Sequence, residues 1–441
     1  MRVGPDRRLV GAAAAWTAAA VVVVAWPPLG APLAGALAVL AALVAWDAWL
    51  LRRAPAVGVR RELPARAFVG RAAEVGLVLQ NDGARPAPLE LIDEVPGDLA
   101  AEEPHFPALV VPARGTLTVR YAVLPAARGD RPCGPAIVLR RSPLGLLRRR
   151  ERGGSGDPLR VYPDTTRFLR PEALRPRRVF AAIGVRPART RGEGMEFESL
   201  RDYVAGDEPR RIDWAASARR GRLVTRLYQH ERHHNVLIAL DASRLMAGLV
   251  GGRSKLDHAV DGALALAYAG LASGDRVGML VFDREVRGLV TPRAHRRHLG
   301  LFVDLLRAVE PAAVEPDYRA LAREIVARQR RRALLIVLTD FVEADPGALV
   351  GPLVQLARRH RVLLVALRDA AYDALAPPTP GGREEPLDLY RRVVLDELLR
   401  GREITLARLR RHGLQTLDLS PAALTASVLN RYLALRHAPA A

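Results

Sequence analysis

The chain has 441 residues, of which 49% are hydrophobic and 26% charged. This balance excludes wholesale disorder, and the length favours roughly two to four domains. The formal net charge is +20, and Lys255 is the only lysine among 67 basic residues, a bias that GC-rich coding can also produce. A single cysteine, Cys133, excludes an internal disulfide framework and a multi-cysteine zinc site within one chain.

Two apolar stretches open the chain. Leu9–Trp26 carries no charge, and Leu29–Leu51 carries one acid, Asp47, near its end. A helix of eighteen residues is about 27 Å long, close to the thickness of the hydrocarbon core of a bilayer. Pro27 and Pro28 interrupt the helix between the two stretches. The pattern predicts a hairpin of two transmembrane helices.

Arginines predict the orientation of this hairpin. They flank its outer ends, whereas the turn between the two stretches carries none: Arg2, Arg7, Arg8, Arg52, Arg53, Arg60, Arg61. The positive-inside rule then places both termini and the whole remaining chain in the cytoplasm, in a multi-pass protein of the inner membrane. A cleaved signal peptide is the alternative, because the first residues resemble its basic start, but it does not explain the second stretch.

The next segment favours a small all-β domain. Short runs such as Glu74–Gln80, Thr116–Val123 and Ala136–Leu139 are bounded by turn residues, and Asn81-Asp82-Gly83 is a turn signal. No long helical periodicity interrupts them. Strands at this spacing predict an immunoglobulin-like β-sandwich over residues 56–162.

A basic segment overlaps the end of this domain. Residues 140–191 hold 15 arginines and 4 acids, a net charge of 15 − 4 = +11. Binding to nucleic acid would need stacking aromatics, and Tyr162, Phe168 and Phe180 are the candidates there. An anionic membrane surface or a merely solvated face explains the charge as well, so nucleic acid is the least favoured partner.

The C-terminal part, residues 235–441, alternates buried strands with amphipathic helices. Predicted strands are Asn235–Leu240, Val277–Phe282, Ala333–Thr339 and Val362–Leu367, and Lys255–Ser273 has the apolar spacing of a helix. Alternation of this kind predicts a doubly wound, mostly parallel α/β sheet with helices on both faces. The proline-rich loop at residues 377–386 is the piece most typical of disorder.

Polar residues follow two of these strands. Asp241 and Ser243 follow the first, and Asp340 follows the third. Ligands of open α/β sheets bind at the carboxyl ends of strands, so these oxygens could hold a hard cation such as Mg²⁺, with a partner's carboxylate completing the shell. Alternatively, both aspartates cap helices or hydrogen-bond the loops.

A long motif precedes the first of these strands. It runs from Gly194-Met195-Glu196-Phe197-Glu198 to Trp214-Ala215-Ala216-Ser217-Ala218-Arg219, and Glu231 and Asp241-Ala242-Ser243 continue it. The motif resembles the signature of the bacterial family called domain of unknown function 58. That resemblance, with the hairpin and the sandwich, covers nearly the whole chain. It implies a von Willebrand factor A-like fold for residues 235–441 and, as partner, a MoxR-type AAA+ ATPase or its client protein.

The implied metal-ion-dependent adhesion site is degenerate. Asp241, Ser243 and Asp340 match the A-domain pattern, but Leu245 replaces its second serine. The loop at residues 314–318, which should supply a threonine, has none. Arg244 is then a candidate to neutralise the carboxylates in place of the metal.

The signature segment, residues 163–234 with the connector, alternates acids and arginines. The interaction candidates in it are Arg201, Asp207, Arg211, Asp213, Trp214 and Arg219. Arginine and carboxylate pair bidentately, which favours a clamp that fixes the segment on the A-like domain. Arginine and tryptophan are also frequent interface anchors, so a partner surface is the alternative.

No catalytic constellation is evident in the sequence. Gly251–Lys255 lacks the spacing of a phosphate-binding loop, and Cys133 has no recognisable base nearby. We therefore expect a membrane-anchored adaptor rather than an enzyme, made of a hairpin (residues 1–55), a sandwich, a connector and an A-like domain. A metal-dependent hydrolase at the strand-end aspartates, or a binder of nucleic acid or anionic membranes through residues 140–191, are the alternatives.

Overall fold

The computed structural model is a mixed α/β protein with several sheets. It describes residues 2–154, 156–164, 196–204, 207, 212–229, 234–295, 297–341, 346–368 and 386–437. The chain divides into two compact units, Met1–Pro163 and Asp164–Ala441. Each unit is described by itself below.

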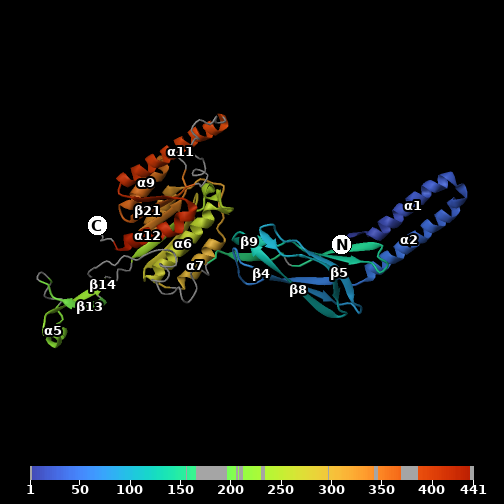
Figure 1. Cartoon of the computed structure of the whole chain (residues 1–441), viewed down its shortest axis with the longest axis horizontal. Helices are drawn as coiled ribbons and strands as arrows, with labels where there is room; N and C mark the ends of the chain where they lie inside the picture. The colour runs from blue at the N-terminus through green and yellow to red at the C-terminus, as the bar shows by residue number, and fades with distance from the viewer. Residues whose placement is uncertain are drawn as a thin grey trace, which may run out of the picture. The chain divides into compact units, whose positions relative to one another are not determined.

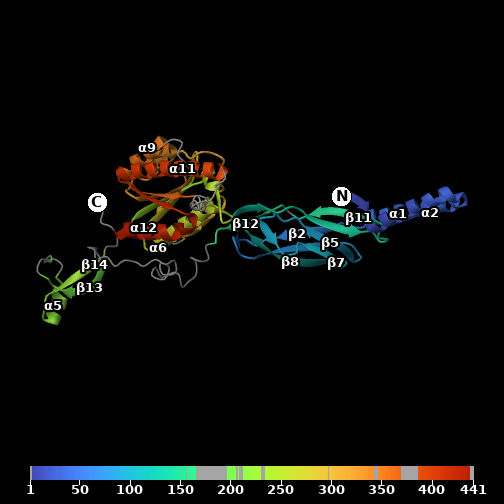
Figure 2. The same ribbon diagram turned by 45° about the horizontal axis from the view of Figure 1, so that its top comes forward.

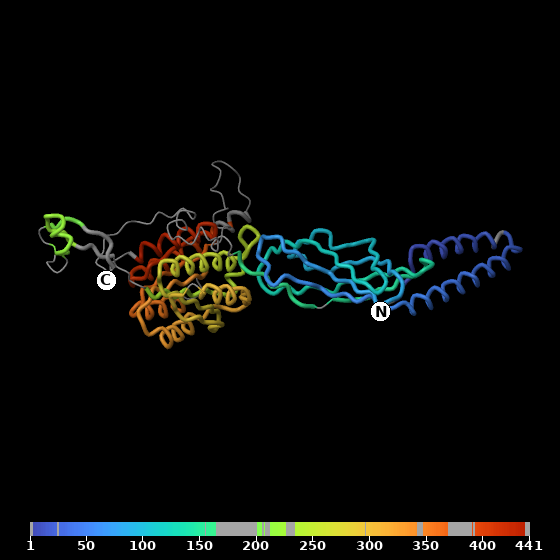
Figure 3. Tube along the Cα trace, turned by 90° about the horizontal axis from the view of Figure 1, so that it is seen from below, coloured from blue at the N-terminus to red at the C-terminus, as the bar shows by residue number. Residues whose placement is uncertain are grey.

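Two helices open the first unit and lie side by side (Figure 3). They are α1 (Arg7–Ala25) and α2 (Gly30–Arg53), joined by the 3-10 turn η1 (Pro27–Leu29). Within the described residues, one helical stretch is long and apolar enough to cross a membrane: Pro27–Arg53, with a mean hydropathy of 2.0. α1 is the shorter helix, with 19 residues. The predicted pair of spans is thus reduced to one candidate.

The β strands of this unit form two larger antiparallel sheets, β2-β4-β8-β6 and β1-β11-β10-β5-β7, and a smaller sheet, β3-β12-β9. One apolar core lies between the larger sheets, with Leu77 and Leu79 from one and Leu91 and Val138 from the other. The strands are β1 (Arg2–Pro5), β2 (Val57–Glu62), β3 (Ala67–Phe68), β4 (Ala73–Asn81), β5 (Ala87–Asp93), β6 (Leu99–Ala101), β7 (His105–Val111), β8 (Gly115–Pro125), β9 (Gly129–Pro132), β10 (Ala136–Arg141), β11 (Leu147–Gly153) and β12 (Pro158–Tyr162).

The first strand was not expected from the sequence. β1 pairs antiparallel with β11, with Arg2 opposite Arg150 and Pro5 opposite Leu147. The N-terminus therefore lies beside β11 at the base of α1 (Figure 2). Within the basic segment, residues 140–141 and 147–153 lie in β10 and β11 of this sheet, and residues 142–146 form the turn between them. Its residues 165–191 lie outside the described residues.

A short antiparallel pair and a helix make up the described part of the signature segment. The elements are β13 (Glu196–Asp202), α5 (Trp214–Arg220) and β14 (Val224–Gln229). Asp213 caps α5 by accepting a hydrogen bond from the backbone N–H of Ala216 at 2.9 Å. Gly221, at φ +63°, ends the helix in the left-handed conformation that glycine adopts at little cost.

A six-stranded sheet is the centre of the second unit, in the order β19-β18-β15-β20-β21-β22 (Figure 1). All neighbours are parallel except β19, which is antiparallel to β18. The five parallel strands follow the order 2-1-3-4-5, which is that of a doubly wound sheet. Their bounds are β15 (Asn235–Asp241), β18 (Arg276–Phe282), β19 (Val286–Arg293), β20 (Leu334–Thr339), β21 (Arg361–Leu367) and β22 (Gln415–Leu419).

Helices cover both faces of this sheet (Figure 1). On one face α8, α9 and α11 bury Leu321, Leu353 and Leu409 against Leu237 and Val337 of the sheet. On the other, α6 packs against β15, β18, α7 and α12. The smaller elements and the helices are η4 (Arg244–Ala247), β16 (Leu249–Val250), β17 (Arg253–Ser254), α6 (Lys255–Ala272), α7 (His298–Arg307), α8 (Tyr318–Arg328), α9 (Pro346–Ala357), α11 (Pro386–Arg411), η5 (Pro421–Ala423) and α12 (Leu424–His437).

The β-sandwich contains a buried charged cluster. Removing one of its charges tests how much the cluster contributes to the stability of the fold. Arg61 pairs with Asp93, and both side chains are 0% exposed. Tyr121 donates a hydrogen bond to Asp93 at 2.5 Å, and Arg61 donates another to the carbonyl of Gly134 at 2.7 Å. Asp93→Ala leaves a buried guanidinium without its anion, so we expect denaturant unfolding to show a loss of about 3–5 kcal/mol.

Glu74→Ala is the matched control, because it breaks an exposed pair with Arg120 on the surface of the same sandwich. Its expected cost is below about 1 kcal/mol. Equal losses in the two variants would show that the buried cluster contributes no more than a surface ion pair.

Candidate functional site

The site lies where the order of the parallel strands reverses, between β15 and β20. Asp241 is the last residue of β15, and Thr339 and Asp340 stand at the end of β20. All three are buried, with exposures of 0%, 0% and 3%. The structure thus brings the two predicted aspartates to one edge of the sheet, at the position where doubly wound folds bind their ligands.

Asp241 is held by neutral hydrogen-bond donors. Its Oδ2 accepts from the hydroxyl of Thr339 at 2.5 Å, and its Oδ1 accepts from the backbone N–H of Ser243 at 2.8 Å. The hydroxyl of Tyr318 lies 2.8 Å from that of Thr339 and extends the chain of hydrogen bonds. Burial raises the pKa of Asp241 to about 7, although the hydrogen bonds from Thr339 and Ser243 oppose this shift.

Asp340 is held by two cationic side chains. Its Oδ2 accepts from the ammonium of Lys255 at 2.8 Å, and its Oδ1 accepts from the guanidinium of Arg402 at 2.7 Å. Arg402 also donates to the carbonyl of Phe341 at 2.8 Å and lies over that ring, 4.6 Å from its centroid. The same guanidinium pairs with Asp418 at 3.0 Å. A single network therefore joins α6, β20, α11 and β22.

This network does not favour the predicted metal. A divalent cation at Asp340 would meet two fixed positive charges, Lys255 and Arg402, on the oxygens it needs. Hard cations require six or more oxygen ligands. Among the residues that the structure describes, no group of three or more His, Cys, Asp or Glu side chains is placed to hold a metal. Ser243 is buried next to Asp241, as expected, but the neighbours of Asp340 are the cationic side chains of Lys255 and Arg402.

The expectation for Arg244 is wrong. Its guanidinium pairs with Glu315 at 2.6 Å, and both side chains are more than half exposed, so it neutralises neither strand-end carboxylate. Lys255 and Arg402 take that role, and sequence reasoning missed both. One feature of the sequence could have indicated Lys255: it is the one lysine of the chain. A Cβ at Gly248 would lie 3.1 Å from its Cε, so this glycine gives the ammonium stem room.

Two of the interaction candidates in the signature segment form a local ion pair. Arg201 pairs with Asp207 at 2.5 Å, and the N–H of Val204 and the hydroxyl of Thr225 also donate to that carboxylate, at 3.1 and 3.3 Å. The Val204 N–H, followed by Arg201, lowers the pKa of Asp207. These contacts lie within the described part of the signature segment, and the predicted clamp onto the A-like domain stays a prediction.

Trp214 and Arg219 are the exposed candidates. Trp214 begins α5 and is 67% exposed. Arg219 is also exposed, and its Nε donates to the carbonyl of Ala215 at 3.2 Å. Asp213 caps the same helix, and Arg211 lies outside the described residues. The segment therefore presents an exposed aromatic ring and an exposed cation on the same short helix.

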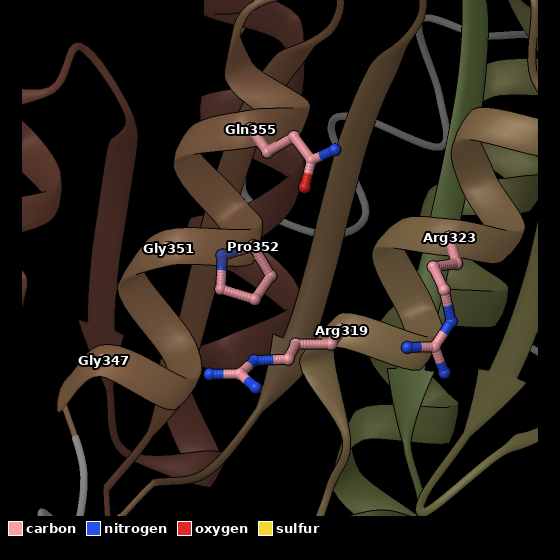
Figure 4. Close-up of a pocket in the computed structure, with 6 residues that line it drawn as sticks. All are labelled: Arg319, Arg323, Gly347, Gly351, Pro352 and Gln355. Atoms are coloured by element: carbon pink, nitrogen blue, oxygen red, sulfur yellow. The ribbon is translucent and has the colours of Figure 1, made fainter.

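A pocket lies on one face of the same unit, between α8 and α9 (Figure 4). It measures about 310 Å³, and its lining contains two exposed arginines and no carboxylate. The guanidinium group of Arg319 points from α8 toward α9, and Arg323 lies one turn further along α8 (Figure 4). The lining residues are Arg319, Arg323, Gly347, Gly351, Pro352 and Gln355. The pocket would suit an anionic group better than a cation.

Comparison with known proteins finds a family model that matches part of this chain. Residues 199–381 match the family model described as Protein of unknown function DUF58, so the resemblance predicted from the signature segment is confirmed over this range. The uncharacterized proteins Rv1480 of Mycobacterium tuberculosis and Mb1516 of Mycobacterium bovis are 28% identical over 180 residues. That match covers 40% of this chain and 56% of each relative, so the chain spans about half the length of the curated relatives it matches.

Solved structures give weaker matches. Proximal thread matrix protein 1 from the mussel byssus is 11% identical over 46% of this chain and 47% of its own, with a TM-score of 0.30. A fragment of Escherichia coli alpha-2-macroglobulin is 16% identical over 25% of this chain and 17% of its own, with a TM-score of 0.21. Neither likeness carries an argument about fold or function.

The raised pKa of Asp241 predicts how stability depends on pH. The folded-state pKa, about 7, exceeds the unfolded value of about 3.9, so the folded state holds the proton more tightly. The stabilisation is complete below about pH 4 and is lost as the pH rises through 7. Asp241→Asn, which cannot ionise, should remove this part of the profile of unfolding midpoint against pH. The exposed Asp304→Asn on α7 is the control; an unchanged slope in Asp241→Asn would contradict the shift.

The network around Asp340 predicts that loss of the buried Lys255–Asp340 ion pair lowers the free energy of unfolding more than loss of the exposed Arg244–Glu315 pair. Lys255→Met keeps the length of the buried stem but removes one cation from Asp340, so we expect a loss of about 3 kcal/mol in denaturant unfolding. Arg244→Met removes the exposed pair with Glu315 and should cost less than about 1 kcal/mol. A Lys255→Met protein as stable as Arg244→Met would mean that Arg402 alone satisfies the carboxylate.

Proposed function

We propose that the protein is a membrane-anchored adaptor. In this proposal α1 and α2 form a two-helix membrane hairpin, the β domain is an immunoglobulin-like spacer, and the doubly wound unit is a von Willebrand factor A-like recognition domain on the cytoplasmic side. Its partner is a MoxR-type AAA+ ATPase or a client of that ATPase. The activity is binding, with no bond chemistry at the strand-end aspartates.

The helix pair supports the anchor. α1 and α2 are in contact, and Trp16 of α1 donates a hydrogen bond to the carbonyl of Leu33 of α2 at 3.4 Å. Exposed apolar side chains on the two helices include Val21, Val22 and Val39. Helices with such surfaces are typical of a lipid environment. Arginines stand at the paired outer ends and favour a cytoplasmic position for both.

Retention of the first helix also follows from its contacts. A signal peptide removed after export would take β1 away from β11 and Asp6 away from Arg148, to which it is bonded at 2.8 Å. The sandwich would then lose an edge strand and expose a row of backbone donors and acceptors. The helices are therefore better explained as a permanent part of the unit.

The observation that carries the adaptor role is the exposure of Trp214. A tryptophan that is 67% exposed at the start of a helix that also carries the exposed Arg219 has the composition of an interface anchor. The strand-end aspartates give less support for a function of their own. Lys255 and Arg402 already pair with Asp340, which argues against a hydrolase at this position. Recognition through exposed surfaces is the better explanation.

A pull-down from detergent extract tests this function. The tagged full chain should retain an AAA+ ATPase, and Trp214→Ala should reduce the amount retained by about tenfold, as expected for an anchor residue worth above 1 kcal/mol. Leu249→Ala is the matched control, because Leu249 is also highly exposed, at 71%, but lies in β16. Absence of any AAA+ protein from repeated extracts would overturn the proposed partner, and equal retention by both variants would overturn the role of Trp214.

A further inference from the structure

The apolar helix α2 carries a carboxylate that is fully buried, Asp47. Its oxygens accept hydrogen bonds from the hydroxyl of Ser142 at 2.5 Å and from the backbone N–H groups of Leu144 and Leu146 at 3.0 and 3.3 Å. All three donors belong to the turn between β10 and β11. The carboxylate therefore fixes this turn against one face of α2, where no lipid reaches it.

The start of α1 is fixed to the same strands. Asp6 accepts a hydrogen bond from the N–H of Arg7, and its own N–H donates to the carbonyl of Leu146 at 2.8 Å. Its carboxylate pairs with Arg148 at 2.8 Å and Arg141 at 3.4 Å. The helix pair and the β domain are thus joined at both helix ends by buried hydrogen bonds, and the turn has a defined height along the helices.

Residues of α2 next to Asp47 show at which level along the helix the β10–β11 turn lies. Trp46 and Trp49 stand within two residues of Asp47, or about 3 Å along the axis. Both are exposed, at 59% and 43%, and their rings stack with centroids 5.3 Å apart. Tryptophans with this exposure at the end of an apolar helix are typical of the membrane–water interface. The turn held by Asp47 therefore lies at the level of an aromatic belt.

Positive charge follows on the outer side of this belt. Arg52 and Arg53 come about one turn after Trp49, both exposed, and the guanidinium of Arg53 lies 4.1 Å from the centroid of the Trp49 ring. Arg7 and Arg8 are exposed at the start of α1. A Cβ at Gly145 would lie 3.4 Å from Cδ of Arg8, which places this arginine next to the turn.

The turn itself presents apolar groups. Leu144 is 40% exposed although its backbone N–H is bonded to Asp47. Pro143 before it is exposed as well. An exposed leucine at the tip of a rigid turn, level with two tryptophans, is what a surface that enters the headgroup layer needs.

We propose that the side chains of Arg8, Trp46, Trp49, Arg52, Arg53 and Leu144, here called the collar, bind the headgroup layer of an anionic phospholipid membrane. The arginines contact lipid phosphates, the tryptophans and Leu144 enter the boundary with the acyl chains, and Asp47 holds the β10–β11 turn in that layer. This inference rests on the proposed membrane anchor and adds to it a lipid class and a fixed attachment of the β domain.

A spin label at the turn tests the depth. The full chain carries Cys133→Ala, which removes its one cysteine, and Leu144→Cys, which takes the nitroxide. In vesicles of phosphatidylcholine and phosphatidylglycerol (7:3), we expect the label to be several times less accessible to a water-soluble nickel chelate than a label at Leu124→Cys. Leu124 is the matched control, because it is 46% exposed on β8 of the same domain. Equal accessibility at both positions, in protein that resists alkaline carbonate extraction, overturns the collar and leaves the anchor intact. Release by carbonate overturns the anchor and the collar together.

Lipid retained through purification tests the charge. Arg52→Gln with Arg53→Gln should lower the ratio of phosphatidylglycerol to phosphatidylcholine bound to the solubilised chain by about fivefold or more, because each arginine near an anionic surface favours binding by about that factor. Arg120→Gln, exposed on β8, should leave the ratio unchanged. A ratio that is the same in all three proteins would overturn phosphate binding by the collar.

Discussion

The ion network at Asp340 is the interaction on which the α/β unit depends. A buried carboxylate is costly unless charge and hydrogen bonds compensate it. Lys255 comes from α6 on one face of the sheet, and Arg402 from α11 on the other, so a single aspartate at the end of β20 connects both helical layers. Arg402 extends the connection to Asp418 at the end of β22. The edge of the sheet where a ligand would enter is thereby closed by the protein's own charges.

The two aspartates of this edge differ because their partners differ. Asp241 accepts from hydroxyl and backbone groups and keeps its proton more easily, whereas Asp340 lies between two cations. Asp93 in the β domain and Asp47 on α2 follow the same physical rule with other donors. Each of these four buried acids connects segments that are distant in sequence, since a different arrangement would leave its carboxylate unsatisfied.

Local pattern predicted much of the fold. The continuous apolar runs of β15, β20 and β21 and the helical spacing of α6 predicted those elements to within a residue or two, because burial on both faces leaves a strong local signature. β1 had no such signature: Arg2–Pro5 is a strand because it pairs with β11, about 145 residues away in sequence. Of the two predicted membrane spans, the described residues contain one stretch that is long and apolar enough to cross a membrane, Pro27–Arg53.

The site was less predictable than the fold. The convergence of Asp241 and Asp340 followed from the topology, but their partners did not, since Lys255 and Arg402 lie 85 and 62 residues from Asp340. Among so many arginines nothing local distinguishes Arg402, and proximity in sequence wrongly favoured Arg244.

The pairing of β1 with β11 also constrains the order of assembly. Residues 2–5 hydrogen-bond to a strand that is made about 145 residues later. Until then α1 has no fixed base, and the edge of the five-stranded sheet stays open. Strand β1 therefore cannot pair before β11 has been made, and the base of α1 is fixed only when β11 is in place.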